Sequence, residues 1–179
     1  MMVIYLIIEA SGTMSVLEVF RVLTSMSNYN PKNPVEFHWY SAEEAGLLGS
    51  KDVAAEYKKR QVQVNAVCHL DLTGYNGKES VVGIVTDFTS PAVSQLMRVL
   101  TKEYLSIPAI DTKCNYACSD HASWTKNGYP AAFPTEAQFK NASPYLHSAK
   151  DVMANISELH CLEFSKLALS FALEVTHKQ

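Results

Sequence analysis

The sequence lacks both an excess of basic residues and a long apolar run. Its 179 residues carry a net charge of −3, and none of the known nucleic-acid recognition modules occurs, so no nucleic-acid partner is expected. No apolar run reaches the roughly 20 residues of a membrane-spanning helix, so no membrane partner is expected either. Internal repeats, low-complexity tracts and linkers are also missing, and the length suggests one domain. A composition of 47% apolar and 18% charged residues suits a globular chain with a core.

The amino-terminal segment lacks the basic residues of a secretory signal. Residues 1–8 are nearly all apolar, and Glu9 is the first charged residue, whereas a signal peptide begins with a positively charged region. We expect a short strand or an extended lead-in here. The alternative is that this segment is not the native beginning of the domain.

Cysteine is scarce, with four residues in the chain. Cys114 and Cys118 lie close together in DTKCNYACSD, a spacing that permits either a tight disulfide or part of a metal site. Asn141 and Asn155 fit the N-glycosylation pattern. A disulfide together with glycosylation sequons would favour an oxidising compartment.

Apolar periodicity predicts strands that alternate with helices. Strands are expected at 35–41, 64–72 and 80–88, and helices at 13–26, 45–60, 90–105, 119–128 and 157–177. Ser11 and Ser119 are predicted N-caps, Pro91 a first-turn residue, and Gly128 the end of the short helix. This alternation predicts an α/β fold with a mostly parallel sheet flanked by helices.

The first helix is predicted to be largely buried, because apolar residues recur along it at spacings of three and four. These residues are Met14, Leu17, Val19, Phe20, Val22 and Leu23. The strand that follows alternates two sets of side chains, as strands with distinct faces do. The sets are Val35, Phe37 and Trp39, and Glu36, His38 and Tyr40.

Acidic residues follow two of the predicted strands. Glu43 and Glu44 come after the strand VEFHWYS, and Asp71 ends the strand VNAVCHLDL. Ligands of open α/β sheets gather at the carboxyl ends of strands. With His147 from the loop SPYLHSAKD, these residues are suitable ligands for a divalent metal, and a spare carboxylate could act as a general base. The alternative is structural: adjacent glutamates often open a helix, an aspartate often ends a strand in a turn, and a loop histidine is often solvated.

Four stretches of the sequence resemble one family of enzymes. The stretches SAEEAGLLGSKDVA, HLDLTGY, YACSDHASWTKNGYPAA and SPYLHSAKD are similar in order and spacing to those of the secreted bacterial and fungal leucine aminopeptidases, which use two adjacent zinc ions. The resemblance runs from about residue 10 to the carboxyl terminus. It implies a zinc-exopeptidase-like fold, with residues 1–9 as an unmatched lead-in and residues 10–179 as the carboxyl-terminal portion of the catalytic domain.

The resemblance also implies roles for individual residues. Glu43 would be the general base, Glu44 and His147 would bind one zinc ion, and Asp71 would bind the other. The reaction implied is release of an amino-terminal amino acid, one with a large apolar side chain, from a peptide substrate through a zinc-activated water. The family is secreted or found in vacuolar and lumenal compartments.

Around these residues the resemblance implies further structure. Cys114 and Cys118 would form a disulfide, and an apolar substrate pocket would lie near their loop. The residues expected to line it are Tyr116, Phe133, Phe139 and Leu146.

The sequence departs from the family pattern in its metal ligands. The family uses five ligands, and two of them find no counterpart: a histidine that would precede this sequence, and an aspartate that bridges both zinc ions. The bridging position falls on Ile8, and Glu9 lies one residue out of register. Since a catalytic zinc ion normally has three protein ligands, we expect this chain alone to have weak activity or none.

Three interpretations of this departure remain open. The chain could be a truncated product of an aminopeptidase gene. It could be a non-catalytic peptide-binding or interaction module derived from an aminopeptidase. It could also be an active enzyme, with a single zinc ion or with ligands supplied by another chain.

Overall fold

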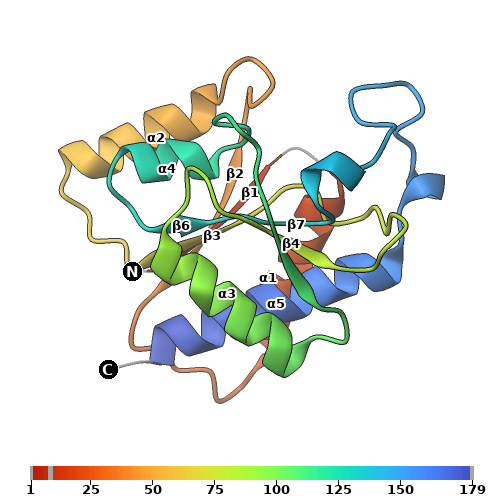
Figure 1. Cartoon of the computed structure of the whole chain (residues 1–179). Helices are drawn as coiled ribbons and strands as arrows, with labels where there is room; N and C mark the ends of the chain where they lie inside the picture. The colour runs from red at the N-terminus through yellow and green to blue at the C-terminus, as the bar shows by residue number, and fades with distance from the viewer. Residues whose placement is uncertain (1, 8–9, 178–179) are drawn as a thin grey trace.

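The computed structural model describes residues 2–7 and 10–177 (Figure 1). Its helices are α1 (Ala10–Ser25), α2 (Leu48–Lys59), α3 (Pro91–Tyr104), α4 (His121–Lys126) and α5 (Glu158–His177), with short 3-10 turns at η1 (Phe139–Asn141) and η2 (Met153–Asn155). Its strands are β1 (Met2–Ile7), β2 (Val35–Tyr40), β3 (Ala66–Leu70), β4 (Val82–Val85), β5 (Ala109–Thr112), β6 (Ala131–Ala132) and β7 (Pro134–Thr135). The predicted helices and strands are therefore confirmed, to within a few residues at their ends.

Parallel pairing dominates the sheets. One sheet has the order β2-β1-β3-β6 with every pair parallel, and β1 lies between β2 and β3. The other has the order β5-β4-β7, in which β4 and β7 are antiparallel. The apolar amino-terminal segment thus forms a strand. The prediction of an α/β fold with a mostly parallel sheet is confirmed.

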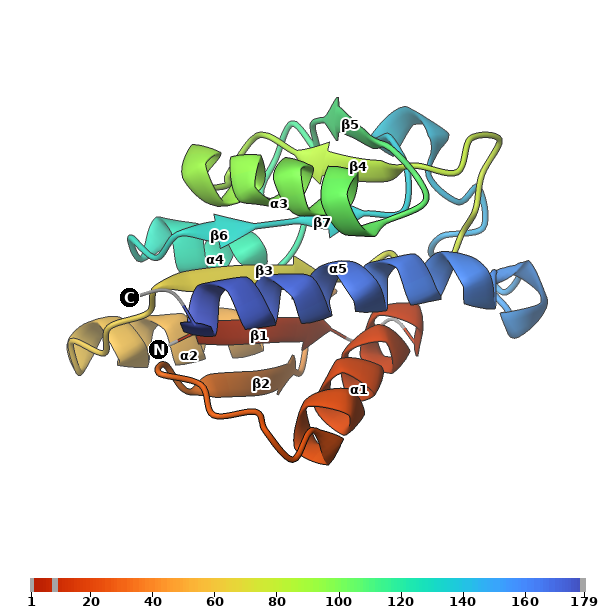
Figure 2. The same ribbon diagram turned by 90° about the horizontal axis from the view of Figure 1, so that it is seen from below.

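Helices cover both faces of the strands. Figures 1 and 2 show α1, α3 and α5 on one face and α2 and α4 on the other. The larger core lies under α1, α3 and α5 and includes Val19, Met97 and Phe171. The smaller core lies under α2 and α4, where Trp124 packs with Tyr40. Because the strands run parallel between these layers, their carboxyl ends meet at one edge.

The predicted burial of α1 is only half right. Val16, Val19 and Leu23 are buried, but Met14, Leu17 and Phe20 expose between 43% and 61% of their surface. An apolar helix residue can stand on the solvent side without disturbing the fold, and sequence spacing does not separate the two sides when apolar residues occupy both.

The burial of the two side-chain sets of β2 does not follow their polarity. Trp39 is 46% exposed although it belongs to the more apolar set, while Tyr40 of the other set is buried. Its hydroxyl accepts a hydrogen bond from the indole nitrogen of Trp124 at 3.2 Å. The polar set therefore faces the α2 and α4 layer, and part of the apolar set faces outward.

The two predicted N-caps have other partners. Ser11 lies inside α1, where its hydroxyl donates to the carbonyl oxygen of Asp71 at 3.4 Å and accepts from the amide of Thr73 at 3.3 Å. Asp120, and not Ser119, holds the cap position of α4. Pro91 in the first turn of α3 and Gly128 after α4, with φ of 85°, follow the prediction. Both serines connect a helix to the end of β3.

In the part of the chain that the structure describes, no helix has the length and apolar character required to cross a bilayer.

Gly12 allows α1 to approach the end of β3. A Cβ atom there would lie 2.7 Å from the carbonyl oxygen of Asp71 and 2.8 Å from that of Leu70. Both are backbone atoms, which cannot rotate away. A Gly12→Ala substitution should therefore lower the free energy of unfolding by about 1–3 kcal/mol, measured by urea denaturation. Met14→Ala, an exposed change in the same helix, should stay within about 0.5 kcal/mol of the wild type. Equal stabilities for the two variants would contradict this prediction.

Candidate active site

The residues expected to carry the chemistry line one cavity of about 820 Å³. Glu43, Glu44, Asp71 and His147 all contribute to its wall. The cavity lies at the carboxyl ends of β2 and β3, where a parallel sheet places its ligands. The apolar candidates line the same cavity; they are Tyr116, Phe133, Phe139 and Leu146.

Glu43 and Glu44 lie in a tight turn between β2 and α2. The carbonyl oxygen of Glu43 accepts hydrogen bonds from the amides of Gly46 and Leu47, both at 2.8 Å. Ala42 and Leu47 have φ values of 59° and 60°, a left-handed conformation that costs non-glycine residues free energy and is often found at functional sites. The helix begins only at Leu48 and has no acidic residue in its first turn. The alternative that the glutamates simply open a helix is therefore wrong.

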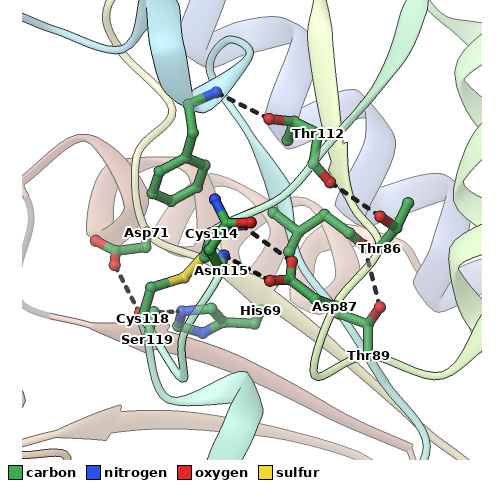
Figure 3. The surroundings of a disulfide bond; sticks show 12 residues. His69, Asp71, Thr86, Asp87, Thr89, Thr112, Cys114, Asn115, Cys118 and Ser119 are labelled. Atoms are coloured by element: carbon green, nitrogen blue, oxygen red, sulfur yellow. Dashed lines mark hydrogen bonds between the residues drawn. A yellow bond between two sulfur atoms is a disulfide. The ribbon is translucent and has the colours of Figure 1, made fainter.

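Asp71 is held by a short chain of hydrogen bonds (Figure 3). The hydroxyl of Ser119 donates to Oδ2 of Asp71 at 2.7 Å and lies 2.8 Å from Nε2 of His69. Since the serine proton points to the carboxylate, His69 must donate from Nε2, which fixes its tautomer. His69 and Ser119 are buried, whereas Asp71 is partly exposed to the cavity. Sequence reasoning missed this function of Ser119 because a serine before a helix is more often a cap.

Glu44 and His147 meet across the cavity mouth. Nε2 of His147 lies 2.8 Å from Oε1 of Glu44, and their side chains are 73% and 68% exposed. His147 has a φ of 57°, so the loop that carries it is also held in a left-handed conformation. The pair brings together residues 103 positions apart in the sequence, from 44 to 147.

Carboxyl groups gather at the cavity: Glu43 and Asp71 line it, and Asp120 is buried close enough for its charge to act on Glu43. Burial, followed by the charges of Asp71, Asp120 and Glu44, raises the pKa of Glu43 to about 7. Burial also raises the pKa of Asp71 to about 6, against the hydrogen bond from Ser119. The pKa of Asp120 rises to about 7 through burial, although Ser50 donates a hydrogen bond to it. A region where burial and neighbouring acids raise the pKa of carboxyl groups is one where a bound cation would be stabilised.

The donor atoms suit zinc in type but not in number. Carboxylates and an imidazole are ordinary zinc ligands. Among the described residues, however, no group of three or more histidine, cysteine, aspartate or glutamate side chains is placed to hold one metal ion. Ile8, on which the bridging position falls, and Glu9, one residue out of register, lie outside the described residues. The described residues therefore offer donor atoms that zinc accepts but no complete set of ligands for one ion.

A disulfide shapes one wall of the cavity. Cys114 and Cys118 are bonded, with Cα atoms 6.0 Å apart, so the disulfide alternative is confirmed. The carboxylate of Asp87 accepts from the amides of Cys114 and Asn115 at 3.0 and 2.6 Å (Figure 3). Tyr116, between the two cysteines, projects into solvent with 61% exposure. The disulfide and the two hydrogen bonds to Asp87 thus hold the loop, which places the aromatic side chain of Tyr116 at the cavity.

The two glycosylation sequons differ in their surroundings. Asn141, at the end of η1, is exposed. The amide nitrogen of Asn155, to which a glycan would be attached, donates to the carbonyl oxygen of Lys150 at 2.8 Å. Asn141 is the more accessible of the two.

Several known proteins with similar sequences and structures are named as aminopeptidases. The chain matches the model of peptidase family M28 over residues 9–172. A probable leucine aminopeptidase of Arthroderma otae is 44% identical over 172 residues, which cover 93% of this chain and 46% of that protein. A probable aminopeptidase of Saccharomyces cerevisiae has the same identity and coverage. The LapA aminopeptidase of Legionella pneumophila superposes with a TM-score of 0.93 at 34% identity, over 100% of this chain and 52% of that one.

These similarities define the family. The α/β fold described above superposes on that of the LapA aminopeptidase. The chain belongs to peptidase family M28. It spans about half the length of the relatives it matches.

Glu136 connects the two loops that carry Asp71 and His147. It is 2% exposed. Its carboxylate accepts from the amides of Gly74 and Tyr75 at 3.1 and 2.7 Å, and from that of Ser143 at 3.4 Å. Sequence reasoning missed this residue, because PTEA reads as a short extended segment and nothing in it signals a buried acid.

The pH dependence of stability should reveal the buried Glu136. Burial raises its pKa to about 7, although three backbone amides lower it, from 4.5 in the unfolded chain. Between these values the folded state binds more protons than the unfolded state, so this carboxyl group makes the protein less stable as the pH rises. The slope is at most about 1.4 kcal/mol per pH unit. In Glu136→Gln this contribution to the slope of the free energy of unfolding against pH should be absent, as measured by urea denaturation between pH 4.5 and 7.

Glu163→Gln is the matched control. Burial raises the pKa of Glu163, but the hydrogen bonds from Lys166 and Ser106 outweigh it and leave the pKa lowered. The stability that Glu163 contributes is therefore lost only as the pH falls below 4.5. Above pH 4.5 the free energy of unfolding of Glu163→Gln should therefore change with pH as that of the wild type does. The prediction would be contradicted if the free energy of unfolding of Glu136→Gln also changed with pH as that of the wild type does between pH 4.5 and 7.

Proposed function

We propose that this chain carries part of the active site of a metallo-aminopeptidase, which removes apolar residues from the amino terminus of peptides. The observation that carries the proposal is the gathering of Glu43, Glu44, Asp71 and His147 around one cavity. Membership of the M28 family supports it. The disulfide suits a secreted or lumenal location.

The two adjacent glutamates would have different tasks. Glu44 already pairs with His147, so it would be a zinc ligand together with that histidine. Glu43 is about half-buried, and its pKa of about 7 lets it take and return a proton near neutral pH. We assign it the general base. Zinc, when bound at a completed site, would supply a Lewis acid and a nucleophilic water.

Substrate selection would come from the wall of the cavity. Phe133 is fixed there, because its ring packs 4.8 Å from the rings of both His69 and His121. Phe139, Leu146 and Tyr116 would complete an apolar pocket for the first side chain of the substrate. Burying a large apolar side chain there would contribute about 1.5–3 kcal/mol to binding.

The purified chain alone should bind little zinc. The described residues do not offer three ligands to one ion, so elemental mass spectrometry after dialysis against trace zinc should find well under one zinc ion per chain. Hydrolysis of leucine p-nitroanilide should be absent in the same preparation. About two zinc ions per chain, or turnover that a chelator abolishes, would show that the site is complete and would contradict the proposed partial site.

The tasks of Glu43 and Glu44 can be separated in a completed domain. In a fusion of this chain to the portion of the Arthroderma otae relative that it does not span, Glu43→Gln should lower kcat by about 10²–10⁴-fold and leave the zinc content unchanged. Glu44→Gln, its matched neighbour, should lower the zinc content as well. Zinc loss from Glu43→Gln, or full activity in either variant, would overturn the assignment.

A second candidate function is peptide binding without turnover. The apolar wall of the cavity is formed, whereas the ligand set is partial. Calorimetry of the chain with a leucyl dipeptide would test this function. Binding without hydrolysis would favour a binding module, and an absence of binding would exclude one for this class of peptide.

A further inference from the structure

The carboxyl group of Asp120 is buried beside the candidate site and has no task in the chemistry proposed above. The residue is 0% exposed. Its Oδ1 accepts a hydrogen bond from the hydroxyl of Ser50, but its Oδ2 has no hydrogen-bond partner among the described residues. Burying a carboxyl oxygen without a partner costs free energy. A buried acid at this position therefore needs a reason beyond packing.

Ser50, the partner of Asp120, lies in the first turn of α2. This turn follows directly on the one that carries Glu43 and Glu44. Ser50 is itself buried, and its hydroxyl lies 2.7 Å from that of Ser123 in α4. Figure 1 shows α2 and α4 side by side. The beginning of α2 is therefore attached to α4 through one serine.

Backbone hydrogen bonds extend this attachment into the glutamate turn. The amide of Gly49 donates to the carbonyl oxygen of Ser41 at 3.1 Å, and that of Leu48 donates to the carbonyl oxygen of Ala42 at 3.2 Å. The two segments are so close that a Cβ atom on Gly49 would lie 2.7 Å from the carbonyl oxygen of Ser41. A shift of the first turn of α2 would therefore also move the residues that lead into Glu43.

The glutamate turn needs support from outside because its own backbone is strained. Ala42 and Leu47 have the left-handed φ values of 59° and 60°. Such conformations of non-glycine residues persist only where the surrounding structure holds them. No side chain caps the amino terminus of α2. The contacts of Ser50 with Asp120 and Ser123 supply support from another element.

The beginning of α4 also holds the other half of the site. Ser119 directly precedes Asp120 and donates to Oδ2 of Asp71 at 2.7 Å. Two consecutive residues thus contact both halves of the cavity, Ser119 after β3 and Asp120 through the first turn of α2. Since neighbouring residues are joined covalently, the backbone at the beginning of α4 sets the spacing between the two halves.

We propose that Asp120 is a positioning residue for the two glutamates of the candidate site. Through Ser50 it keeps the turn in its strained conformation, with Glu43 at the cavity and Glu44 opposite His147. It acts through the turn and does not touch the substrate. The catalytic meaning of this inference rests on the proposed function, whereas the connection from Asp120 to the turn can be tested without activity.

Amide hydrogen exchange of the full chain, followed by NMR, tests the connection. The amides of Gly46 and Leu47 donate to the carbonyl oxygen of Glu43 within the turn. In Asp120→Ala they should exchange about tenfold faster or more, because a hydrogen bond to a charged group is lost. The amide of Val67 in the buried strand β3 is the reference for opening of the whole fold. Asp120→Asn keeps an acceptor oxygen and should stay within about threefold of the wild type.

Two serine variants provide the matched comparison. Ser50→Ala removes the other partner and should accelerate exchange in the turn as Asp120→Ala does, so it decides the test if Asp120→Ala does not fold. The double variant S50A/D120A should be no faster than the faster single variant, because both changes break one interaction. Ser165 is also buried, and its hydroxyl donates to the carbonyl oxygen of Ser15 at 3.1 Å. Ser165→Ala should leave exchange in the turn, relative to Val67, unchanged.

Activity of the fusion described above gives the catalytic readout. Per zinc-loaded enzyme, Asp120→Ala should lower kcat about tenfold or more at unchanged KM, and Asp120→Asn should recover most of that loss. Three results would overturn the proposal: unchanged exchange in both Asp120→Ala and Ser50→Ala, equal acceleration in Ser165→Ala, or an unchanged kcat in Asp120→Ala. A fusion without turnover would count against the proposed function, and the exchange experiment would then decide whether Asp120 holds the turn.

Discussion

The burial of several carboxyl groups near one another is the constraint on which this edge of the molecule depends. Burial is the main reason why the pKa values of Glu43, Asp71 and Asp120 are raised, and the charges of neighbouring acids add to it. Parallel strands bring Glu43 and Asp71 together, because the carboxyl ends of such strands meet at one side of the sheet, and Asp120 comes from the cap position of α4. A fold under selection for stability alone would place apolar residues there. A bound cation would offset the cost of gathering these acids.

Several contacts from other parts of the chain hold these acids in place. Ser119 donates to Asp71 and is itself fixed by His69. Glu136 connects the loop after Asp71 to the loop before His147 through backbone amides. The absence of a side chain at Gly12 lets α1 approach the same strand end. These contacts come from segments far apart in the sequence, so the site is a property of the whole fold.

The sequence predicts the fold well and the site in part. Alternating strand and helix periodicities reveal the elements, because each element has a regular apolar pattern. The candidate residues stand out because acids after buried strands are unusual, and a resemblance in several stretches supplied their roles. Ser119 and Glu136 could not be found, because their importance lies in partners 48 and more than 60 residues away. The exposure of Met14 and Leu17 was missed for a related reason: apolar spacing does not tell which neighbour covers a helix face.

The candidate residues depend on two strands that differ in their place in the sheet. β2 leads into Glu43 and Glu44, and among the described strands only β1 pairs with it. Asp71 follows β3, which has a described strand on each side. The glutamates are therefore positioned from an edge strand and Asp71 from a central strand, so their separation depends on the pairing of β1 with both.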